Sequence, residues 1–272
     1  TALQSKNRAM LSLFASILAS DILPIFLIAL AGYLLAKFAA VSIQSVSRVV
    51  FYALMPCLAF RMLYTSSATG PNVGRLMALG LLTMGSMAVI GFLAARMLGL
   101  DSSVRRAFMM VVMYSNSGNY GLPVVRFAFG PEALTYATIY FLTGSVTTSL
   151  SSAFFAGSRR GNILGALDKI WRMPSLYGMT AAAIVLWTGI PIPEGVMRPI
   201  EMLSDAALAV MILVLGMQLE KAAWPKRPSI VVLAVSISLI VTPILSYFLC
   251  TLMGITGPAL QAGVLLSSMP VA

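Results

Sequence analysis

Histidine is absent from this chain, and charged residues make up only 10% of its 272 positions. A soluble protein of this length needs a charged surface, so this small share of charge argues against a soluble domain. Hydrophobic residues account for 59% of the sequence, and the mean hydropathy is +0.94. The composition therefore predicts an all-α polytopic membrane protein that lies in a lipid bilayer.

The lack of histidine, with few acids and cysteines, also excludes most catalytic and metal chemistry. Cys57 and Cys250 lie in apolar runs with no second ligand at metal-binding spacing, so we expect both to be small buried hydrophobic residues. An intramembrane enzyme needs a nucleophile with a base, paired carboxylates or metal ligands. The sequence offers none of these sets, so we expect no enzymatic activity, no metal site and no cofactor.

The net charge of +10 does not indicate nucleic-acid binding, because no run of basic residues is longer than two. In so apolar a chain, Lys and Arg are expected to gather in cytoplasmic loops. With the N-terminus outside, twelve basic residues fall on the cytoplasmic side and six on the outer side. The bias predicts a multi-pass protein of the cell (inner or plasma) membrane with its N-terminus outside. The cytoplasmic group is Lys37, Arg48, Arg96, Arg105, Arg106, Arg159, Arg160, Lys169, Arg172, Lys221, Lys226 and Arg227.

Nine apolar segments are long enough to cross a bilayer, and short loops rich in glycine and proline separate them. Two of these segments, and the breaks inside them, match at a shift of 152 residues, so that SNSG at 115–118 falls on SSMP at 267–270. Five spans separate the matched segments, which predicts inverted repeats of the kind that secondary transporters use. The expected spans are 21–38, 46–64, 74–98, 104–130, 132–156, 174–192, 202–219, 229–252 and one that starts at 258.

The fourth expected span contains the polar stretch MYSNSGNYGLPV at 113–124. Asn116 to Asn119 are weak helix formers, and Pro123 removes a backbone donor. An unpaired backbone group in hydrocarbon is costly, so we expect this break to line a cavity, with the N-terminus of the second half-helix near Tyr120 to Leu122. The alternative is a kinked structural helix whose asparagines join two helices. The second break, at SSMP, favours the cavity.

The stretch NSGNYGLP at 116–123 resembles the fourth-span signature of the auxin efflux carrier family, within the superfamily of the bile acid:sodium symporters. DILPIFLIALAGYLLAKF, FYALMPCLAF, LAVMILVLGMQL and SSMPVA are similar to other spans of that family. The resemblance implies ten spans in two inverted five-helix repeats, whose broken fourth and ninth helices cross at the bilayer midplane. The short loop at 157–173 favours a prokaryotic-type member.

The resemblance divides the chain into a first repeat at 1–156, a cytoplasmic loop at 157–173 and an incomplete second repeat at 174–272. It implies that Pro123 and Pro270 lie at the crossing, and that Asn116, Ser267 and Ser268 are part of the polar lining. About nine of ten spans would be present, since the sequence ends just after the ninth-span break. The expected substrate-binding residues are Asn116, Ser117, Gly118, Asn119, Tyr120, Gly121, Pro123, Ser267, Ser268 and Pro270.

Two helix N-termini with amides and hydroxyls suit a carboxylate, whereas half-helix C-termini could bind Na⁺ instead. The resemblance favours a small organic anion, such as a carboxylate or an auxin-like compound. The coupling ion, H⁺ or Na⁺, and a homodimeric assembly stay open, as do a sodium-coupled organic-anion symporter and a ligand-sensing membrane module. Asp21 and Asp205 are expected at helix starts, as caps or as proton carriers.

Overall fold

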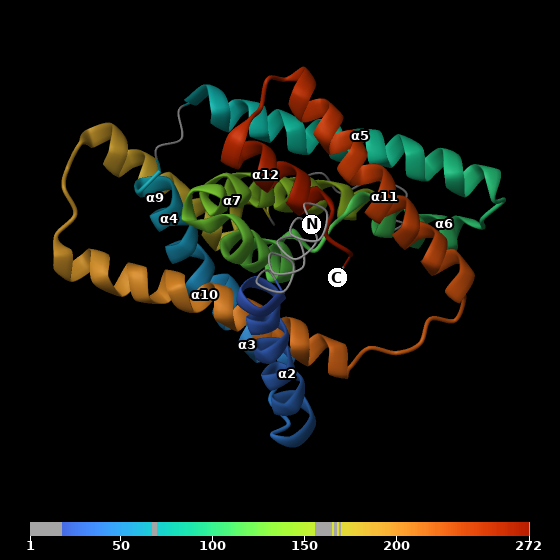
Figure 1. Cartoon of the computed structure of the whole chain (residues 1–272), viewed down its shortest axis with the longest axis horizontal. Helices are drawn as coiled ribbons and strands as arrows, with labels where there is room; N and C mark the ends of the chain where they lie inside the picture. Colours follow the sequence, from blue (N-terminus) through green and yellow to red (C-terminus); the bar gives the residue numbers. More distant parts are fainter. Residues whose placement is uncertain (1–17, 67–69, 156–164, 166–167, 169, 272) are drawn as a thin grey trace, which may run out of the picture.

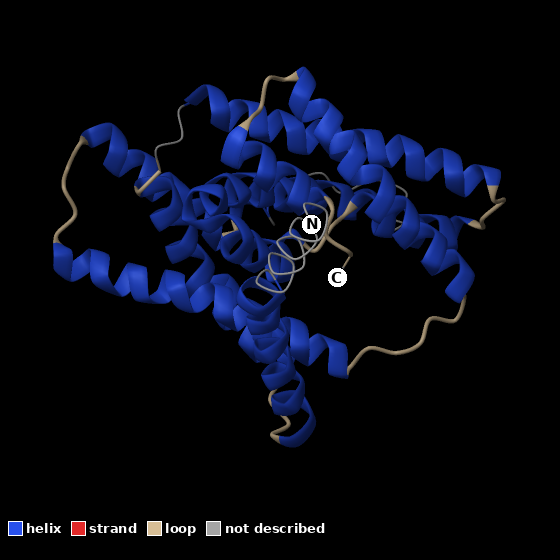
Figure 2. Ribbon diagram, viewed as in Figure 1, coloured by secondary structure: helices blue, strands red, loops and turns tan. Residues whose placement is uncertain are grey.

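The computed structural model describes residues 18–66, 70–155, 165, 168 and 170–271, and every regular element in these ranges is helical (Figure 1; Figure 2). The predicted all-α class is thereby confirmed. In chain order the elements are the π-helical turn η1 (Leu18–Ile22), α2 (Leu23–Phe38), α3 (Ile43–Val49), the π-helical turn η2 (Val50–Leu54), α4 (Met55–Tyr64), α5 (Gly70–Met97), α6 (Ser102–Met113), the π-helical turn η3 (Ser117–Gly121), α7 (Leu122–Phe155), α9 (Pro174–Thr188), α10 (Glu194–Glu220), α11 (Pro228–Leu252) and α12 (Gly257–Ser267).

The helices begin and end at residues suited to those positions. Asp101 caps α6, because its side chain accepts a hydrogen bond of 3.4 Å from the backbone amide of Val104. Helix α9 begins at Pro174, whose missing N–H is not needed in a first turn, and it ends before Gly189, whose φ of 65° favours glycine. Local sequence thus fixes several span ends.

The elements follow the nine expected spans with two differences in detail. The fourth span is divided between α6 and the first part of α7, and the non-helical Gly130, with φ 81° and ψ −169°, separates that part from the fifth span. The seventh was expected to begin near 202, but α10 begins at Glu194. The expected start was wrong because an apolar run marks the part of a helix in the membrane, whereas α10 continues past it through charged residues.

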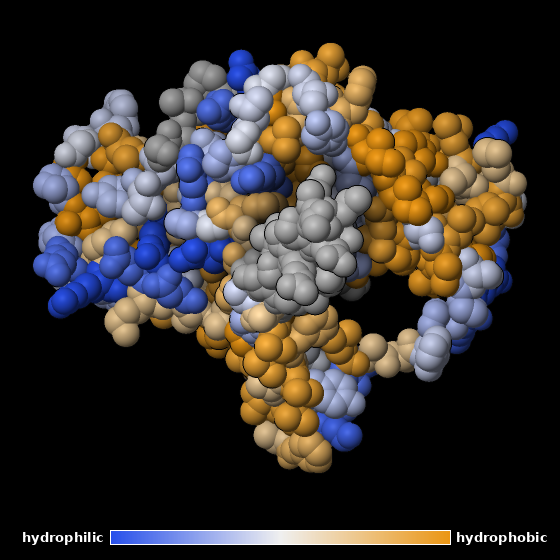
Figure 3. All heavy atoms as spheres, in the orientation of Figure 1, coloured by the Kyte–Doolittle hydropathy of each residue, from blue (hydrophilic) through white to orange (hydrophobic). Residues whose placement is uncertain are grey.

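Four stretches of the described helices are long and apolar enough to span a membrane, namely Ile43–Tyr64, Asn72–Met97, Glu194–Glu220 and Pro228–Leu252. Helix α2 is equally apolar but has 16 residues. Phe26, Ile240 and Phe248 each leave 60% or more of their surface exposed, which suits lipid contact better than water. Apolar residues cover α2 and the region of α5 and α11 in Figure 3. The chain is a multi-pass membrane protein.

The helices pack into two groups (Figure 1). In the first, α2 packs along α10, and α4 packs against α9 and α10; in the second, α12 packs on α7, and α5 and α11 pack on α6. Glycines allow the close approach of α2 and α10, since a Cβ on Gly216 would lie 1.8 Å from the carbonyl oxygen of Ala29. We call these the α2–α10 group and the α7–α12 group.

The main apolar core joins the two groups. It contains Leu54 and Leu58 from the second span, Leu122 and Tyr140 from α7, and Met211 from α10, all buried. This core leaves cavities on either side of it along the seam between the groups. The candidate site lies in the larger of the two.

Candidate functional site

The fourth span is broken at residues 114–116. Helix α6 ends at Met113, and the backbone is extended at Tyr114, with φ −115° and ψ 123°. Asn116, with φ −74° and ψ 61°, is also outside the helical region. The chain is helical again from Ser117, and the first hydrogen bond of the resumed helix joins the amide of Gly121 to the carbonyl of Asn116 at 3.0 Å.

This break lies at the start of the stretch 113–124 in which the sequence predicts it. The amides of 117–120 precede the first hydrogen bond of the resumed helix, so they form its N-terminal end. The amide of Leu122 already donates to the carbonyl of Ser117. Pro123 is buried in the first turn of α7, where the helix is continuous. The expected N-terminus near Tyr120 to Leu122 agrees with the start of α7 at Leu122, but the π-helical turn η3 precedes α7 and moves the unbonded amides to 117–120.

The non-helical residues that follow α12 contact the first break. Helix α12 ends at Ser267, 154 residues after the end of α6 at Met113, close to the shift seen in the sequence. The backbone amide of Asn116 donates a hydrogen bond of 2.8 Å to the carbonyl oxygen of Pro270. The segment after α12 thus supplies a partner for a backbone amide of the first break, which an isolated broken helix in a membrane would lack.

The two broken helices come closest at Gly121. A Cβ at this position would lie 2.5 Å from Cδ2 of Leu266 and 3.2 Å from Cγ of Met269. A larger residue would require the side chains of Leu266 and Met269 to move. Glycine at 121 therefore suits the close packing of these side chains.

A cavity of about 610 Å³ opens beside the first break, between the two helix groups. Its wall is formed by the second span, by the break, by the middle of α7 and by α10. The described residues that line it are Ser47, Arg48, Val50, Phe51, Tyr52, Met55, Met84, Tyr114, Ser115, Asn116, Ser117, Gly118, Asn119, Phe141, Gly144, Ser145, Thr148, Met211, Val214 and Val271.

Four of the ten expected site residues, Asn116, Ser117, Gly118 and Asn119, line this cavity. No hydrogen bond to the side-chain amide of Asn116 or Asn119 occurs within the described residues, and Asn116 is only 8% exposed. Two amides at the start of a half-helix are thus available to a ligand. Their positions, next to free backbone amides, suit an anionic group.

The other six expected residues do not line the cavity. Tyr120 packs against the small apolar cluster around Ile212, and Gly121 and Pro123 are buried at the crossing. The hydroxyls of Ser267 and Ser268 donate to the carbonyl of Val264 at 2.8 Å and 2.6 Å, and Pro270 contributes its carbonyl to Asn116. These residues shape the crossing rather than the cavity surface.

Most of the other cavity wall was not identified from the sequence. The middle of α7 contributes Ser145 and Thr148, whose hydroxyls donate to the carbonyls four residues earlier at 2.9 Å and 2.8 Å. The hydroxyl of Tyr114, in the break, forms a hydrogen bond with the hydroxyl of Ser151, which also belongs to α7. The run of Ser and Thr at 143–152 is a polar stripe within an apolar span, and this signal could have identified α7 as a cavity wall.

Arg48 is the most consequential residue that sequence reasoning missed. The sequence places it at the cytoplasmic end of the second span, and Arg48 was not among the expected site residues. The structure places Arg48 in the cavity wall, in the last turn of α3. Nothing in the sequence distinguishes Arg48 from the other cytoplasmic cations.

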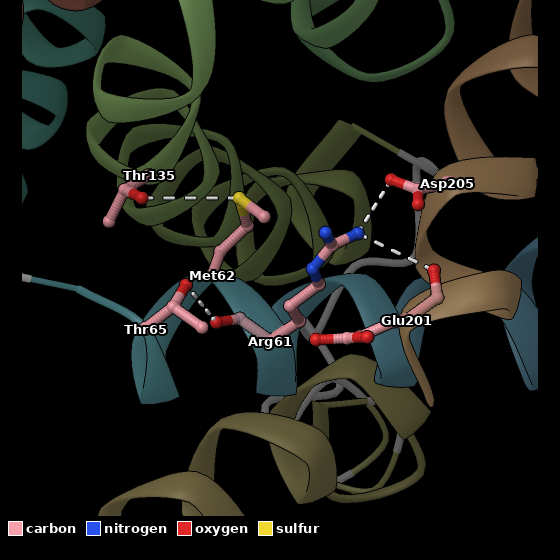
Figure 4. A network of polar contacts seen from close by, with 6 residues as sticks. All are labelled: Arg61, Met62, Thr65, Thr135, Glu201 and Asp205. Carbon is pink, nitrogen blue, oxygen red and sulfur yellow. Dashed lines mark hydrogen bonds and ion pairs between the residues drawn. The ribbon is translucent and has the colours of Figure 1, made fainter. Parts of the chain in front are cut away.

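A second cavity of about 430 Å³ lies on the other side of the core, beside Arg61 and Glu132. Here Arg61 Nη1 lies 2.5 Å from Asp205 Oδ1 and donates to the carbonyl of Glu201 at 3.4 Å (Figure 4). Asp205 is well inside α10, so its expected role as a helix-start cap is wrong. The side chain of Asp21 lies outside the described residues.

Between α5, α7, α11 and α12 there is also a void of about 10 Å³ lined by hydroxyls, among them those of Ser238 and Ser267. Thr83 Oγ1 and Thr242 Oγ1 are buried at its wall without a hydrogen-bond partner, although Thr83 is close to the hydroxyl of Tyr140. In the described part of the chain, no cluster of three or more His, Cys, Asp or Glu side chains could bind a metal. The void is about the size of one water molecule.

Comparisons with known proteins agree with this architecture. An uncharacterized transporter of Methanothermobacter thermautotrophicus is 26% identical over 260 residues, which cover 92% of this chain and 84% of the relative. An uncharacterized transporter of Methanocaldococcus jannaschii is 29% identical over 171 residues, covering 60% of this chain and 54% of the relative. A family model described as membrane transport protein matches residues 17–164, more than half of the sequence and all of the first break. The chain therefore belongs to the membrane transport protein family, the family of the auxin efflux carriers.

Proposed function

We propose that the protein is a secondary transporter that carries small organic anions across the cell membrane by alternating access around the cavity at the broken helices. The family and its transporter relatives support transport. One observation supports an anionic substrate, namely the composition of the cavity wall. Its described residues bring together amides, hydroxyls and one guanidinium without any carboxylate.

The chemistry of this wall suits a carboxylate attached to an apolar body. Free backbone amides at 117–119 and the side chains of Asn116 and Asn119 offer hydrogen-bond donors at a positive helix end. Phe51 and Phe141 add aromatic surface to the wall, and the ring of Phe141 lies beside Gly118 of the break. The described wall has no nucleophile paired with a base, which supports transport rather than catalysis.

The orientation of the basic residues suggests how substrate reaches the site. With the N-terminus outside, Ser47 and Arg48 belong to the cytoplasmic end of the second span, and the cavity they line opens towards the cytoplasm. The cavity beside Arg61 then faces outside. The buried core between the two cavities would have to open for substrate to pass.

The test uses the purified full-length protein in proteoliposomes. Radiolabelled mono- and dicarboxylates are measured both for uptake in exchange for internal substrate and for equilibrium binding. We expect saturable uptake of at least one acid. Binding without uptake would instead identify a ligand-sensing membrane module, and neither binding nor uptake of any acid would contradict the proposal.

A sodium-coupled symporter is the second candidate, and the hydroxyl-lined void favours it. The buried hydroxyl of Thr242 lacks a hydrogen-bond partner among the described residues, and a monovalent cation or a water molecule in the void would satisfy it. Replacing external Na⁺ by K⁺ during uptake separates these occupants. Sodium-dependent uptake that Thr242→Val abolishes would support the symporter. Uptake at the same rate in Na⁺ and in K⁺ would contradict it and would indicate that water occupies the void.

A further inference from the structure

A third cavity, of about 540 Å³, opens at the surface of the α2–α10 group. Its wall is formed by the end of α2, by the turn that leads into α3 and by the last residues of α10. In the proposed orientation these ends all lie on the cytoplasmic side, at the level of the lipid headgroups. The polar residues of the described wall are Lys37, Ser42, Gln44, Glu220 and Lys221, and none of them lines the cavity at the broken helices.

Lys37 is an exposed cation without an acidic partner among the residues that the structure describes. Its ammonium group lies 5.7 Å from the ring centroid of Tyr33 and 5.5 Å from that of Phe38. Such contacts hold an exposed cation weakly, and they leave the three N–H donors of the ammonium group free. Lys37 can therefore bind an anion that enters the cavity.

Glu220 supplies a hydrogen-bond acceptor in the same wall. Its Oε2 is buried and lies 3.0 Å from Nζ of Lys221, but this ion pair between neighbouring residues lacks the geometry of a hydrogen bond. Oε2 therefore has no hydrogen-bond partner among the described residues, and a buried polar oxygen in this condition calls for a ligand or a water molecule. Since Lys221 balances the charge of Glu220, the wall keeps the positive charge of Lys37 and offers an acceptor for a hydroxyl group.

The surface beside the cavity is apolar. Leu34, Leu35 and Phe38, in the last turns of α2, each leave 40% or more of their surface exposed. Apolar residues cover α2 in Figure 3. A soluble anion would leave this surface unused, whereas a lipid whose headgroup enters the cavity can lay its acyl chains along α2. Basic pockets between helices on the cytoplasmic side are typical sites for anionic headgroups.

We propose that this cavity binds the headgroup of an anionic glycerophospholipid that carries free hydroxyls, of the phosphatidylglycerol type. The phosphate binds Lys37, and a hydroxyl of the glycerol headgroup donates to Oε2 of Glu220. The same carboxylate repels a headgroup that ends in a phosphate with a second charge, as in phosphatidic acid. The bound lipid joins the end of α2 to the end of α10, the two helices that pack along each other in the α2–α10 group. This inference does not depend on which substrate is transported.

The experiment measures lipid binding to the purified full-length protein in detergent by native mass spectrometry, with the melting temperature as a second readout. The probes are phosphatidylglycerol, phosphatidic acid, phosphatidylcholine and soluble glycerol 3-phosphate. The variants are Lys37→Gln, Glu220→Gln and the control Lys226→Gln. Lys226 is an exposed cation in the loop after α10 that does not line the cavity.

Wild-type protein should bind phosphatidylglycerol, which raises its melting temperature, and should bind each of the other probes about 10-fold more weakly. Lys37→Gln should weaken the binding of phosphatidylglycerol about fivefold, the effect of one cation near a membrane surface. Glu220→Gln should instead lower the preference for phosphatidylglycerol over phosphatidic acid about 10-fold, because the neutral amide no longer repels the second phosphate charge. Lys226→Gln should match the wild type.

Several results would overturn the inference. Equal binding of phosphatidylglycerol and phosphatidic acid by the wild type would mean that no headgroup hydroxyl is bound, and this comparison does not depend on the folding of any variant. Equal losses in Lys37→Gln and Lys226→Gln would show only a general attraction between basic residues and anionic lipid. Glycerol 3-phosphate that binds as tightly as the lipid would identify a soluble anion as the ligand. A folded Glu220→Gln variant with the wild-type lipid preference would exclude the carboxylate from the site.

Discussion

The amide of Asn116 and the carbonyl of Pro270 are joined by a hydrogen bond of 2.8 Å, although 154 positions separate the two residues. The bond joins two backbone atoms, so it persists when the side chain of Asn116 is changed. It leaves the side-chain amide of Asn116 free to face the cavity. The structural and the ligand-binding parts of this residue can therefore be separated by mutation.

Asn116→Ala should keep the fold and weaken substrate binding. The variant retains the backbone bond to Pro270 but loses one amide aimed at the anion, a loss of about 1–3 kcal/mol. We expect KM to rise by roughly 5- to 100-fold while the melting temperature stays near that of the wild type. Asn72→Ala, in the first turn of α5, is the matched control because Asn72 lines neither large cavity. A variant that melts early yet binds normally would show that Asn116 joins helices instead.

Gly121→Ala should separate the crossing helices. The added Cβ would lie 2.5 Å from Leu266 Cδ2, and relieving that overlap costs about 1–3 kcal/mol in a packed core. We expect a lower melting temperature and a large loss of uptake. Gly85→Ala is the control, since its Cβ would meet no atom within 4 Å and alanine favours a helix interior. Equal stability of the two variants would contradict the tight crossing.

Pro123→Ala should have little effect on transport. The sequence alone predicts a steep loss, because the proline was expected to keep the span open. In the structure the break lies at 114–116. An amide restored at 123 would donate to a carbonyl near Asn119, so the new hydrogen bond would lie after the break and would not close it. We expect uptake within about threefold of the wild type and a stability change below about 1 kcal/mol. A variant that folds but no longer transports would show that the π-helical turn η3 depends on Pro123.

Cysteine labelling should place the two ends of α10 on opposite sides of the membrane. In a background in which alanine replaces Cys57 and Cys250, Glu194→Cys should react with an impermeant maleimide from outside. Trp224→Cys, in the exposed loop after α10, should react only after permeabilisation. The reverse pattern would contradict the assigned orientation, and labelling of both from one side would contradict a membrane-spanning α10.

The sequence predicted the parts of the fold that depend on hydropathy and local chemistry. The positions of the spans, the turn at Gly130, the existence of the first break and the end of α12 near SSMP all follow from apolar runs and weak helix formers. The π-helical turn η3 at the start of the resumed helix was not predicted, because no local sequence pattern distinguishes it from the α-helix that follows. In a membrane, backbone groups near Tyr114 can stay outside a helix once another segment satisfies them.

The cavity wall was harder to predict because its members come from distant spans. Arg48 and Met211 reach one cavity only through the packing of α10 against the second span, which no local pattern encodes. Hydropathy assigns Arg48 to a loop end, and it does not distinguish a cation at a cavity mouth from one in a loop. Asp205 was misplaced for the related reason that its helix extends beyond the apolar run.

The bond between Asn116 and Pro270 also has a consequence for how the protein is made. A ribosome inserts the first break into the membrane well before it has synthesised the residues of the second. Until α12 arrives, the amide of Asn116 has no protein partner of the kind seen in the folded state, and water or the insertion machinery must supply one. The newly made first half is therefore a vulnerable intermediate, and proteolytic quality control should act on chains that stall before residue 270.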